Sequence, residues 1–195
     1  HVADTAEWLA THSIHPLRTR RVEDDKPLAV MLSVVLLFGS NATNASELVE
    51  RAIRRSEEEV GAMQRLSAEY RSEPYGFTAE SEFVNRAAEF LTEEDAYEVL
   101  RRINLIEAEL GRDRAVEREV QQQMGERYAS RPIDIDIIFY GDLSFNDERL
   151  TIPYHFLAER EYALRPLVEI APDREHPALE HTPRKMLEML TKNEL

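Results

Sequence analysis

Two aspartates lie two residues apart in an otherwise apolar stretch. Asp134 and Asp136 belong to "SRPIDIDIIFYGD" (residues 130–142), where isoleucine, phenylalanine and tyrosine surround them. Because side chains of a β-strand alternate between its two faces, both carboxylates should point the same way, with their Cα atoms about 7 Å apart. The opposite face is predicted to enter the core and to carry Ile133, Ile135, Ile137 and Phe139.

Two carboxylates at this separation suit a divalent metal ion. They repel each other, and one takes up a proton unless a cation lies between them. Oxygen ligands favour Mg²⁺ or Mn²⁺, which fill their remaining positions with water and phosphate oxygens. The alternative is an edge strand whose outer face simply contacts water, and the aspartates alone do not decide between the two.

Arginines precede the two aspartates. Arg131 begins the predicted strand, and the segment before it contains Arg112, Arg114, Arg118 and Arg127. Acids that bind a metal beside arginines that bind phosphate are the components of a phosphoryl-transfer site. Residues 112–130 are polar and charged, and are predicted to form a long mobile loop. The same loop carries Asp113, Glu117, Glu119 and Glu126, so a solvated, salt-bridged loop is the alternative.

Composition restricts the class of protein. The net charge of −14 argues against a general nucleic-acid binder, and the absence of cysteine excludes disulfides and thiolate metal sites. The longest apolar run, residues 28–39, is too short to span a bilayer and follows a charged segment unlike a signal peptide. No glycine-rich phosphate-binding motif occurs, so metal and arginines would have to hold any nucleotide. A cytoplasmic location without membrane contact is expected.

The elements follow from hydrophobic periodicity and end signals. Strands are predicted within residues 33–40, 63–77, 82–91 and 131–141, and helices within 41–60 and 92–111. Asn44 is a candidate cap for the first helix. Thr92 and Asp95 are predicted to form a capping box, with Gly111 at the C-cap. Thr182 and Pro183 are predicted to open a last helix.

The order β-α-β-β-α-β indicates an α+β fold, a ferredoxin-like sandwich with helices packed on one face of an antiparallel sheet. We expect one domain over residues 31–195, preceded by an N-terminal extension of unknown role at residues 1–30.

Seven segments resemble one family, the 6-hydroxymethyl-7,8-dihydropterin pyrophosphokinases of folate biosynthesis. They occur in the family's order: "LFGSN" (37–41), "YRSEPYG" (70–76), "FVNRA" (83–87), "IEAELGRDR" (106–114), "SRPIDIDIIFYGD" (130–142), "RLTIPYH" (149–155) and "REYALRPLVEIAP" (160–172). The resemblance implies the fold already inferred. It also implies transfer of a pyrophosphoryl group from ATP to the hydroxymethyl oxygen of the pterin, with release of AMP.

The resemblance also implies roles for individual residues. Asp134 and Asp136 would hold two Mg²⁺ ions, and Arg112 and Arg131 would stabilise charge on the transferring phosphates. ATP would contact Asn104, Glu107, Arg114, Arg127, Tyr128, Ile137, Arg149, Thr151, Tyr154, His155 and Arg160. The pterin would contact Ser72, Tyr75, Phe83, Asn85 and Tyr162, with Phe83 and Tyr162 on either side of its ring. Residues 115–127 would form a lid over ATP.

The sequence departs from the family's usual pattern at Tyr154, which stands where a histidine is usual. Either the neighbouring His155 takes over the role, or Tyr154 contacts ATP itself. Phe83 and Tyr162 could instead be ordinary core aromatics. The alternatives at the level of function are a Mg²⁺-dependent nucleotidyltransferase or phosphodiesterase, and a non-catalytic ferredoxin-like module. A monomer is expected, with fusion to or association with other folate enzymes as a further option.

Overall fold

The computed structural model describes residues 30–73, 82–124 and 132–193, and its centre is an antiparallel sheet. Strand β1 (Leu32–Ser40) lies between β4 (Phe83–Thr92) and β5 (Asp134–Tyr140), while β2 (Ala62–Leu66) and β3 (Tyr70–Ser72) both pair with β4. Helix α2 (Ala45–Glu59) follows β1, and α3 (Ala96–Glu109) follows β4. The strand order β2-β4-β1-β5 with these two helices confirms the predicted ferredoxin-like β-α-β-β-α-β arrangement.

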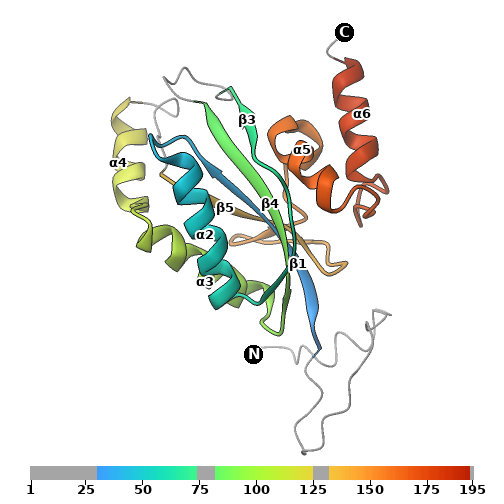
Figure 1. The fold of residues 1–195 in the computed structure, drawn as a ribbon, viewed down its shortest axis with the longest axis horizontal. Coiled ribbons are helices and arrows are strands. Elements are labelled where there is room, and N and C mark those ends of the chain that lie inside the picture. Colours follow the sequence, from blue (N-terminus) through green and yellow to red (C-terminus); the bar gives the residue numbers. More distant parts are fainter. Residues whose placement is uncertain (1–29, 74–81, 125–131, 194–195) are drawn as a thin grey trace, which may run out of the picture.

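Helices α2 and α3 cover one face of the sheet (Figure 1). Alternate residues of β1, among them Leu36 and Phe38, point into this layer and meet the apolar stripes of the two helices. The stripes contain Leu48, Val49 and Ile53 of α2, and Val99, Ile103 and Ile106 of α3. Their burial is the main apolar contribution to the stability of this half of the fold.

The opposite face of the sheet is also covered by helices. Val35 and Leu37 of β1 pack there against Leu164 and Leu167 of α5 (Glu161–Ile170), and α6 (Pro183–Asn193) packs on α5. The 3₁₀ helix η1 (Leu157–Glu159) and the short hairpin of β6 (Phe145–Asn146) and β7 (Thr151–Ile152) precede them. The predicted one-sided packing therefore holds for the β-α-β-β-α-β unit but omits this second helical layer, which β1 requires because both of its faces are apolar.

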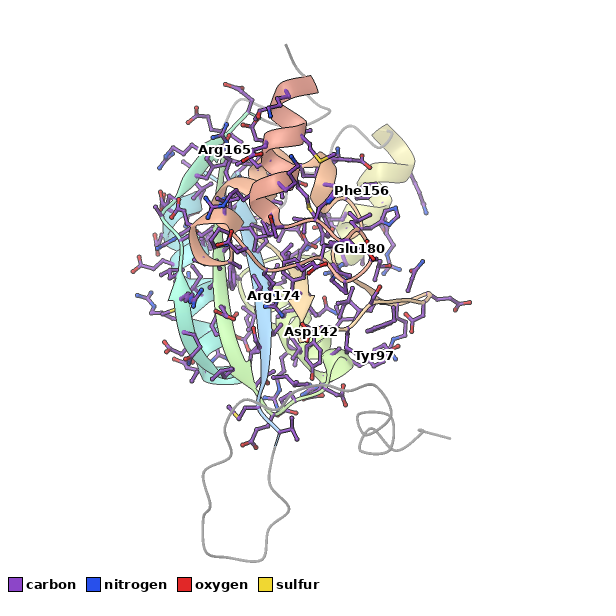
Figure 2. All side chains as sticks on the ribbon, turned by 90° about the vertical axis from the view of Figure 1, so that its right-hand side faces the viewer. Tyr97, Asp142, Phe156, Arg165, Arg174 and Glu180 are labelled. Carbon is purple, nitrogen blue, oxygen red and sulfur yellow. The ribbon has the colours of Figure 1, made fainter. Side chains whose placement is uncertain are left out.

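The C-terminal segment is attached to one end of the sheet through Arg174. Its guanidinium donates to the carbonyl oxygen of Gly141 at 2.6 Å and to the Ser33 hydroxyl at 3.0 Å, and lies 4.8 Å from the Phe139 ring. Figure 2 shows Arg174 and Asp142 near this end of the sheet. Within the described ranges, none of the helices combines the length and the apolar character needed to cross a membrane.

A β-bulge interrupts strand β5. Val35 pairs with Phe139 but Leu36 pairs with Ile137, so Ile138 is an extra residue. Ile135 and Ile137 enter the layer of α2 and α3, whereas Ile138 and Phe139 both enter the layer of α5. The prediction that Phe139 shares a face with the three isoleucines was therefore wrong. The aspartates precede the bulge, so their common face is unaffected.

The segment after α3 is a helix over most of its length, so the predicted mobile loop was wrong there. Helix α4 (Arg114–Met124) begins after Asp113, whose carboxylate accepts the N–H groups of Ala115 and Val116 at 2.9 and 3.1 Å. The end of the predicted lid, with Arg127, lies outside the described residues, as do Tyr128 and Arg131. So do Tyr75 and nearly all of the predicted N-terminal extension.

The ends of the helices test the predicted caps. Gly111 follows α3 with φ 98°, and the Thr182 hydroxyl accepts the Lys185 N–H at 3.3 Å, as predicted for both helix ends. Asn44 is at the N-cap position of α2, but its side chain makes no capping bond. The predicted capping box was wrong by three residues: Asp95 itself is the N-cap of α3 and accepts the N–H groups of Tyr97 and Glu98, both at 2.9 Å.

Replacing Asp95 with alanine should lower the free energy of unfolding by about 1 kcal/mol, because two N–H groups of the first turn lose their acceptor. Urea denaturation measures this change. Glu93→Ala, at an exposed neighbouring position, is the control and should change the free energy by less than about 0.5 kcal/mol. Equal effects of the two substitutions would contradict the assignment of the cap.

Candidate active site

Asp134 and Asp136 lie on β5, which is an edge strand of the described sheet. Both are half-buried, and their side chains share the face that α5 covers. The start of the strand is held by Ser40, whose hydroxyl donates to the carbonyl oxygen of Pro132 at 2.5 Å. Because β5 is at the edge of the sheet, groups from both of its faces can reach one cavity beside it.

A cavity of about 680 Å³ lies along this edge, between α3, α4, β5 and the segment from β7 to η1. Ten residues that were predicted to bind ATP or metal, or to stabilise the phosphates, lie together on the wall of this cavity. They are Asn104, Arg112, Arg114, Asp134, Asp136, Ile137, Arg149, Thr151, Tyr154 and His155. Residues of the wall that the sequence reasoning did not assign to the site include Leu100, Ile103, Glu117, Leu150 and Phe156. Leu100 and Ile103 belong to the apolar stripe of α3.

The guanidinium of Arg112 is the centre of an ionic cluster at one end of the cavity. Nη1 donates to Oε1 of Glu107 at 2.6 Å and to Oδ1 of Asp134 at 2.5 Å, while Nε donates to Oε1 of Glu117 at 2.9 Å. Arg112 is only 7% exposed. Burial by itself would lower the pKa of Arg112, but the surrounding carboxylates, Asp134 first, raise it, so the group stays charged.

Glu107 is 1% exposed and lies behind the cavity wall. Besides Arg112, its carboxylate accepts the backbone N–H of Ile135 at 2.8 Å and a bond from Nη2 of Arg114 at 2.5 Å. Burial raises the pKa of Glu107, and the neighbouring arginines oppose that shift. These contacts place β5 and two arginines relative to α3. The predicted contact of Glu107 with ATP stays a prediction.

Asn85 and Asp134 flank Gly39 in one row across three strands. In the strand register Gly39 pairs with Asn85 of β4 on one side and with Asp134 of β5 on the other. Neighbouring strands lie about 4.8 Å apart, so the two side chains leave their strands roughly 10 Å from each other. A Cβ added to Gly39 would lie 3.1 Å from Oδ1 of Asn85, so glycine leaves space between them. The row connects the predicted pterin and metal positions.

Asn85 is 3% exposed and donates from Nδ2 to the Ser72 hydroxyl at 3.1 Å. Ser72 and Tyr162 line a second cavity of about 410 Å³, between β3 and α5. Phe83, two residues before Asn85 on the same strand, is half-buried and is not on the wall of that cavity. The structure thus brings Asn85, Ser72 and Tyr162 to one region, as the prediction required.

Comparison with known proteins finds similarity over the part of the chain that contains these site residues. A family model described as 7,8-dihydro-6-hydroxymethylpterin-pyrophosphokinase (HPPK) matches residues 35–172. The chain belongs to this family. The match includes the larger cavity, the row from Asn85 to Asp134, and the lining of the second cavity except for Leu190.

Two curated relatives illustrate the range of this family. The 2-amino-4-hydroxy-6-hydroxymethyldihydropteridine pyrophosphokinase of Methylorubrum extorquens is 36% identical over 144 residues, which are 73% of this chain and 85% of the relative. The folate synthesis bifunctional protein of Arabidopsis thaliana is 33% identical over 137 residues, 70% of this chain. The chain spans only 26% of that plant protein.

A solved structure shows the same fold at low sequence identity. The wild-type HPPK-DHPS of Plasmodium falciparum superimposes with a TM-score of 0.64 at 16% identity, over 88% of this chain and 46% of that one. At this identity the likeness concerns the fold alone.

Tyr154 and His155, the two candidates for the position where the HPPK family usually has histidine, both line the larger cavity. The Tyr154 hydroxyl is 3.4 Å from that of Tyr162, and burial raises the pKa of both phenols. His155 packs edge-on against Phe156, with ring centroids 4.6 Å apart, and Arg160 lies 4.9 Å from the same ring. Figure 2 labels Phe156 on the segment before α5. Tyr154 therefore contacts Tyr162, which lines the second cavity, while Tyr154, His155 and Arg160 all contact Phe156.

The described residues contain no group of three or more histidine, aspartate or glutamate side chains placed to hold a metal ion. The predicted metal ligands at the cavity are Asp134 and Asp136, and a third carboxylate on its wall, Glu117, pairs with Arg112. Oδ1 of Asp134 accepts the bond from Arg112, and each carboxylate oxygen carries two lone pairs. Two carboxylates fit Mg²⁺, which is commonly held by one or two carboxylates together with water and phosphate oxygens.

Replacing Glu107 with alanine should lower the free energy of unfolding by about 3 to 5 kcal/mol, because it leaves a buried guanidinium and the Ile135 N–H short of an acceptor. Urea denaturation is the measurement. Glu109→Ala removes an exposed acid of the same helix that pairs with Arg55, and should cost less than about 1 kcal/mol. Equal costs would show that Glu107 does not hold the cluster together.

Proposed function

We propose that the chain transfers the pyrophosphoryl group of ATP to the hydroxymethyl oxygen of 6-hydroxymethyl-7,8-dihydropterin, giving the pterin diphosphate and AMP. The observation that carries this proposal is the row Asn85–Gly39–Asp134, because it sets a buried amide opposite a carboxylate at a separation that a pterin can bridge. Membership of the HPPK family supports the same reaction.

ATP would occupy the larger cavity. Leu100, Ile103 and Leu150 give it an apolar wall on which a purine could lie, and Asn104 and Thr151 add polar groups beside that wall. Arg112, Arg114 and Arg149 bring positive charge to the same space. The triphosphate would therefore lie toward Asp134 and Asp136, with its charge balanced by arginines and metal in place of a glycine-rich loop.

Asp134 and Asp136 would hold Mg²⁺, with two ions expected from the resemblance to the family. When bound, Mg²⁺ would supply positive charge that compensates the negative charge of the phosphates. The aspartates bind and orient in this scheme, and Arg112 holds Asp134 in place through the contact at 2.5 Å.

The pterin would lie on the Asn85 side of the row. Asn85 would hydrogen-bond the amide-like edge of the ring, since a buried amide needs partners for all its polar groups and, within the described residues, its side chain donates to Ser72. Tyr162 would stack on one face of the ring, with Phe83 on the other. This places the hydroxymethyl group toward Asp134, where the transferred phosphate must be.

Release of AMP requires that the hydroxyl oxygen attacks the β-phosphorus and that the bond between this phosphorus and the bridging oxygen to the α-phosphate breaks. Phosphoryl transfer leaves little covalent work for the protein, so positioning and charge stabilisation suffice. The chain contributes by orienting both substrates and by keeping Arg112 charged. No strong general base is demanded, and the hydroxyl proton can pass to water.

Three further expectations stay predictions. These are the boundary between an extension at residues 1–30 and the domain at 31–195, a monomeric state, and a cytoplasmic location. Association with other folate enzymes is a proposal that the names of the plant bifunctional protein and of HPPK-DHPS support.

With Mg²⁺, ATP and the hydroxymethyldihydropterin, the protein should form AMP in a pterin-dependent way, measured by chromatography. Asp134→Ala and Asp136→Ala should each lower the rate at least about 10²-fold, because phosphate charge is no longer compensated. Asp142→Ala, an exposed acid just beyond the same strand, is the control and should keep the rate. Formation of ADP, or pterin-independent turnover, would contradict the proposed reaction.

Replacing Asn85 with alanine should raise the KM for the pterin about tenfold or more while leaving the KM for ATP unchanged, because only the pterin loses hydrogen-bond partners. Initial-rate measurements with each substrate varied separately provide the test, with thermal unfolding as a check on folding. An equal rise in both KM values would remove Asn85 from the pterin site.

A further inference from the structure

Helix α4 supplies a carboxylate to the outer edge of Arg112. Oε1 of Glu117 accepts from Nε at 2.9 Å, and Oε2 accepts from Nη2 at 3.3 Å. The Glu117 side chain is 14% exposed and the Arg112 side chain 4%. This two-point arrangement is the geometry with which arginine binds a phosphate.

The other carboxylates on Arg112 come from elements of the packed core. Glu107 on α3 and Asp134 on β5 share Nη1. Glu117 alone takes the edge formed by Nε and Nη2 in the described part of the chain. A phosphate can reach that edge of Arg112 only if Glu117 leaves it.

Helix α4 is attached mainly by polar contacts. Among the described elements it has no extensive packing against another helix or a strand. Its Val116 is 52% exposed, so apolar burial contributes little there. The contacts that connect α4 to the cavity are those of Glu117 with Arg112 and of Arg114 with Asn104 and Glu107. Losing one of them is compatible with an intact core.

We propose that Glu117 is a positioning residue, which holds the Nε–Nη2 edge of Arg112 until the phosphate chain of the nucleotide displaces it. This inference rests on the proposed function, since it takes ATP as the ligand of the larger cavity. Displacement exchanges one anion for another on the same guanidinium, so the cluster stays neutralised throughout. It follows that Glu117 lowers the affinity for ATP and that nucleotide binding detaches the first turns of α4 from Arg112.

The test compares the binding of the α,β-methylene analogue of ATP, with Mg²⁺, to the wild-type chain and to Glu117→Gln, by isothermal titration calorimetry. Neutralising Glu117 weakens its hold on Arg112, so the variant should bind the analogue roughly three- to tenfold more tightly. Glu119→Gln changes charge equally at an exposed site of the same helix and should bind as wild type does.

Glu117→Asp tests whether the contact with Arg112 or the charge alone matters, because the shorter side chain keeps its charge but no longer reaches Arg112. It should also bind more tightly than wild type. Tighter binding should appear in kinetics as a lower KM for ATP without a higher kcat. A role in stability alone would move neither value in this direction.

Unchanged or weaker binding by both Glu117 variants would overturn the inference, as would an equal gain in Glu119→Gln. If the wild-type chain binds the analogue but forms no AMP from ATP and the pterin, the proposed function fails. The comparison of variants still decides the role of Glu117. If the wild-type chain does not bind the analogue, both proposals are wrong.

Discussion

The buried guanidinium of Arg112 joins three parts of the chain at one point. It contacts Glu107 on α3, Asp134 on β5 and Glu117 on α4, and Glu107 in turn accepts the backbone N–H of Ile135. A charge removed from water must be surrounded by partners, so each of these groups keeps the others in place. The position of the edge strand relative to α3, and with it the width of the larger cavity, depends on this cluster.

The edge position of β5 explains how one strand can serve two purposes. Its isoleucines before the bulge fill the core under α2 and α3, while its aspartates face the α5 side, and both sets meet the cavity at the free edge. The bulge at Ile138 then turns Phe139 toward α5, where that layer needs apolar cover. Strand β5 therefore begins with two carboxylates at a binding site, although both of its faces are buried after the bulge.

Local patterns were enough to predict the central unit and the common face of the two aspartates, while most of the other candidate site residues came from the resemblance to the family. Alternation placed Asp134 and Asp136 on one face, and the apolar stripe of α3 together with Gly111 placed the C-terminal end of that helix to within two residues, although its N-cap was predicted three residues too early. The failures have specific causes. The bulge depends on how Leu36 and Val35 pair with a strand about 100 residues away. Helix α4 has an apolar stripe of only three residues, Val116, Val120 and Met124, among charged and amide side chains, so the segment was interpreted as a loop although Asp113 is a recognisable cap. Glu117 was predicted only to offset the positive charge of a loop, because its pairing with Arg112 arises only when the chain folds.

The sequence by itself determined the residue types of the site and their grouping along strands and helices, because strand alternation and helical periodicity are local properties of the chain. It also determined family membership, through segments whose order survives at modest identity. Tertiary structure alone decided which groups meet. The row Asn85–Gly39–Asp134 exists only once three strands adopt one register, and the burial of Glu107 exists only once α3 packs against β5. Register and burial arise from contacts between distant segments, and no local pattern encodes their geometry.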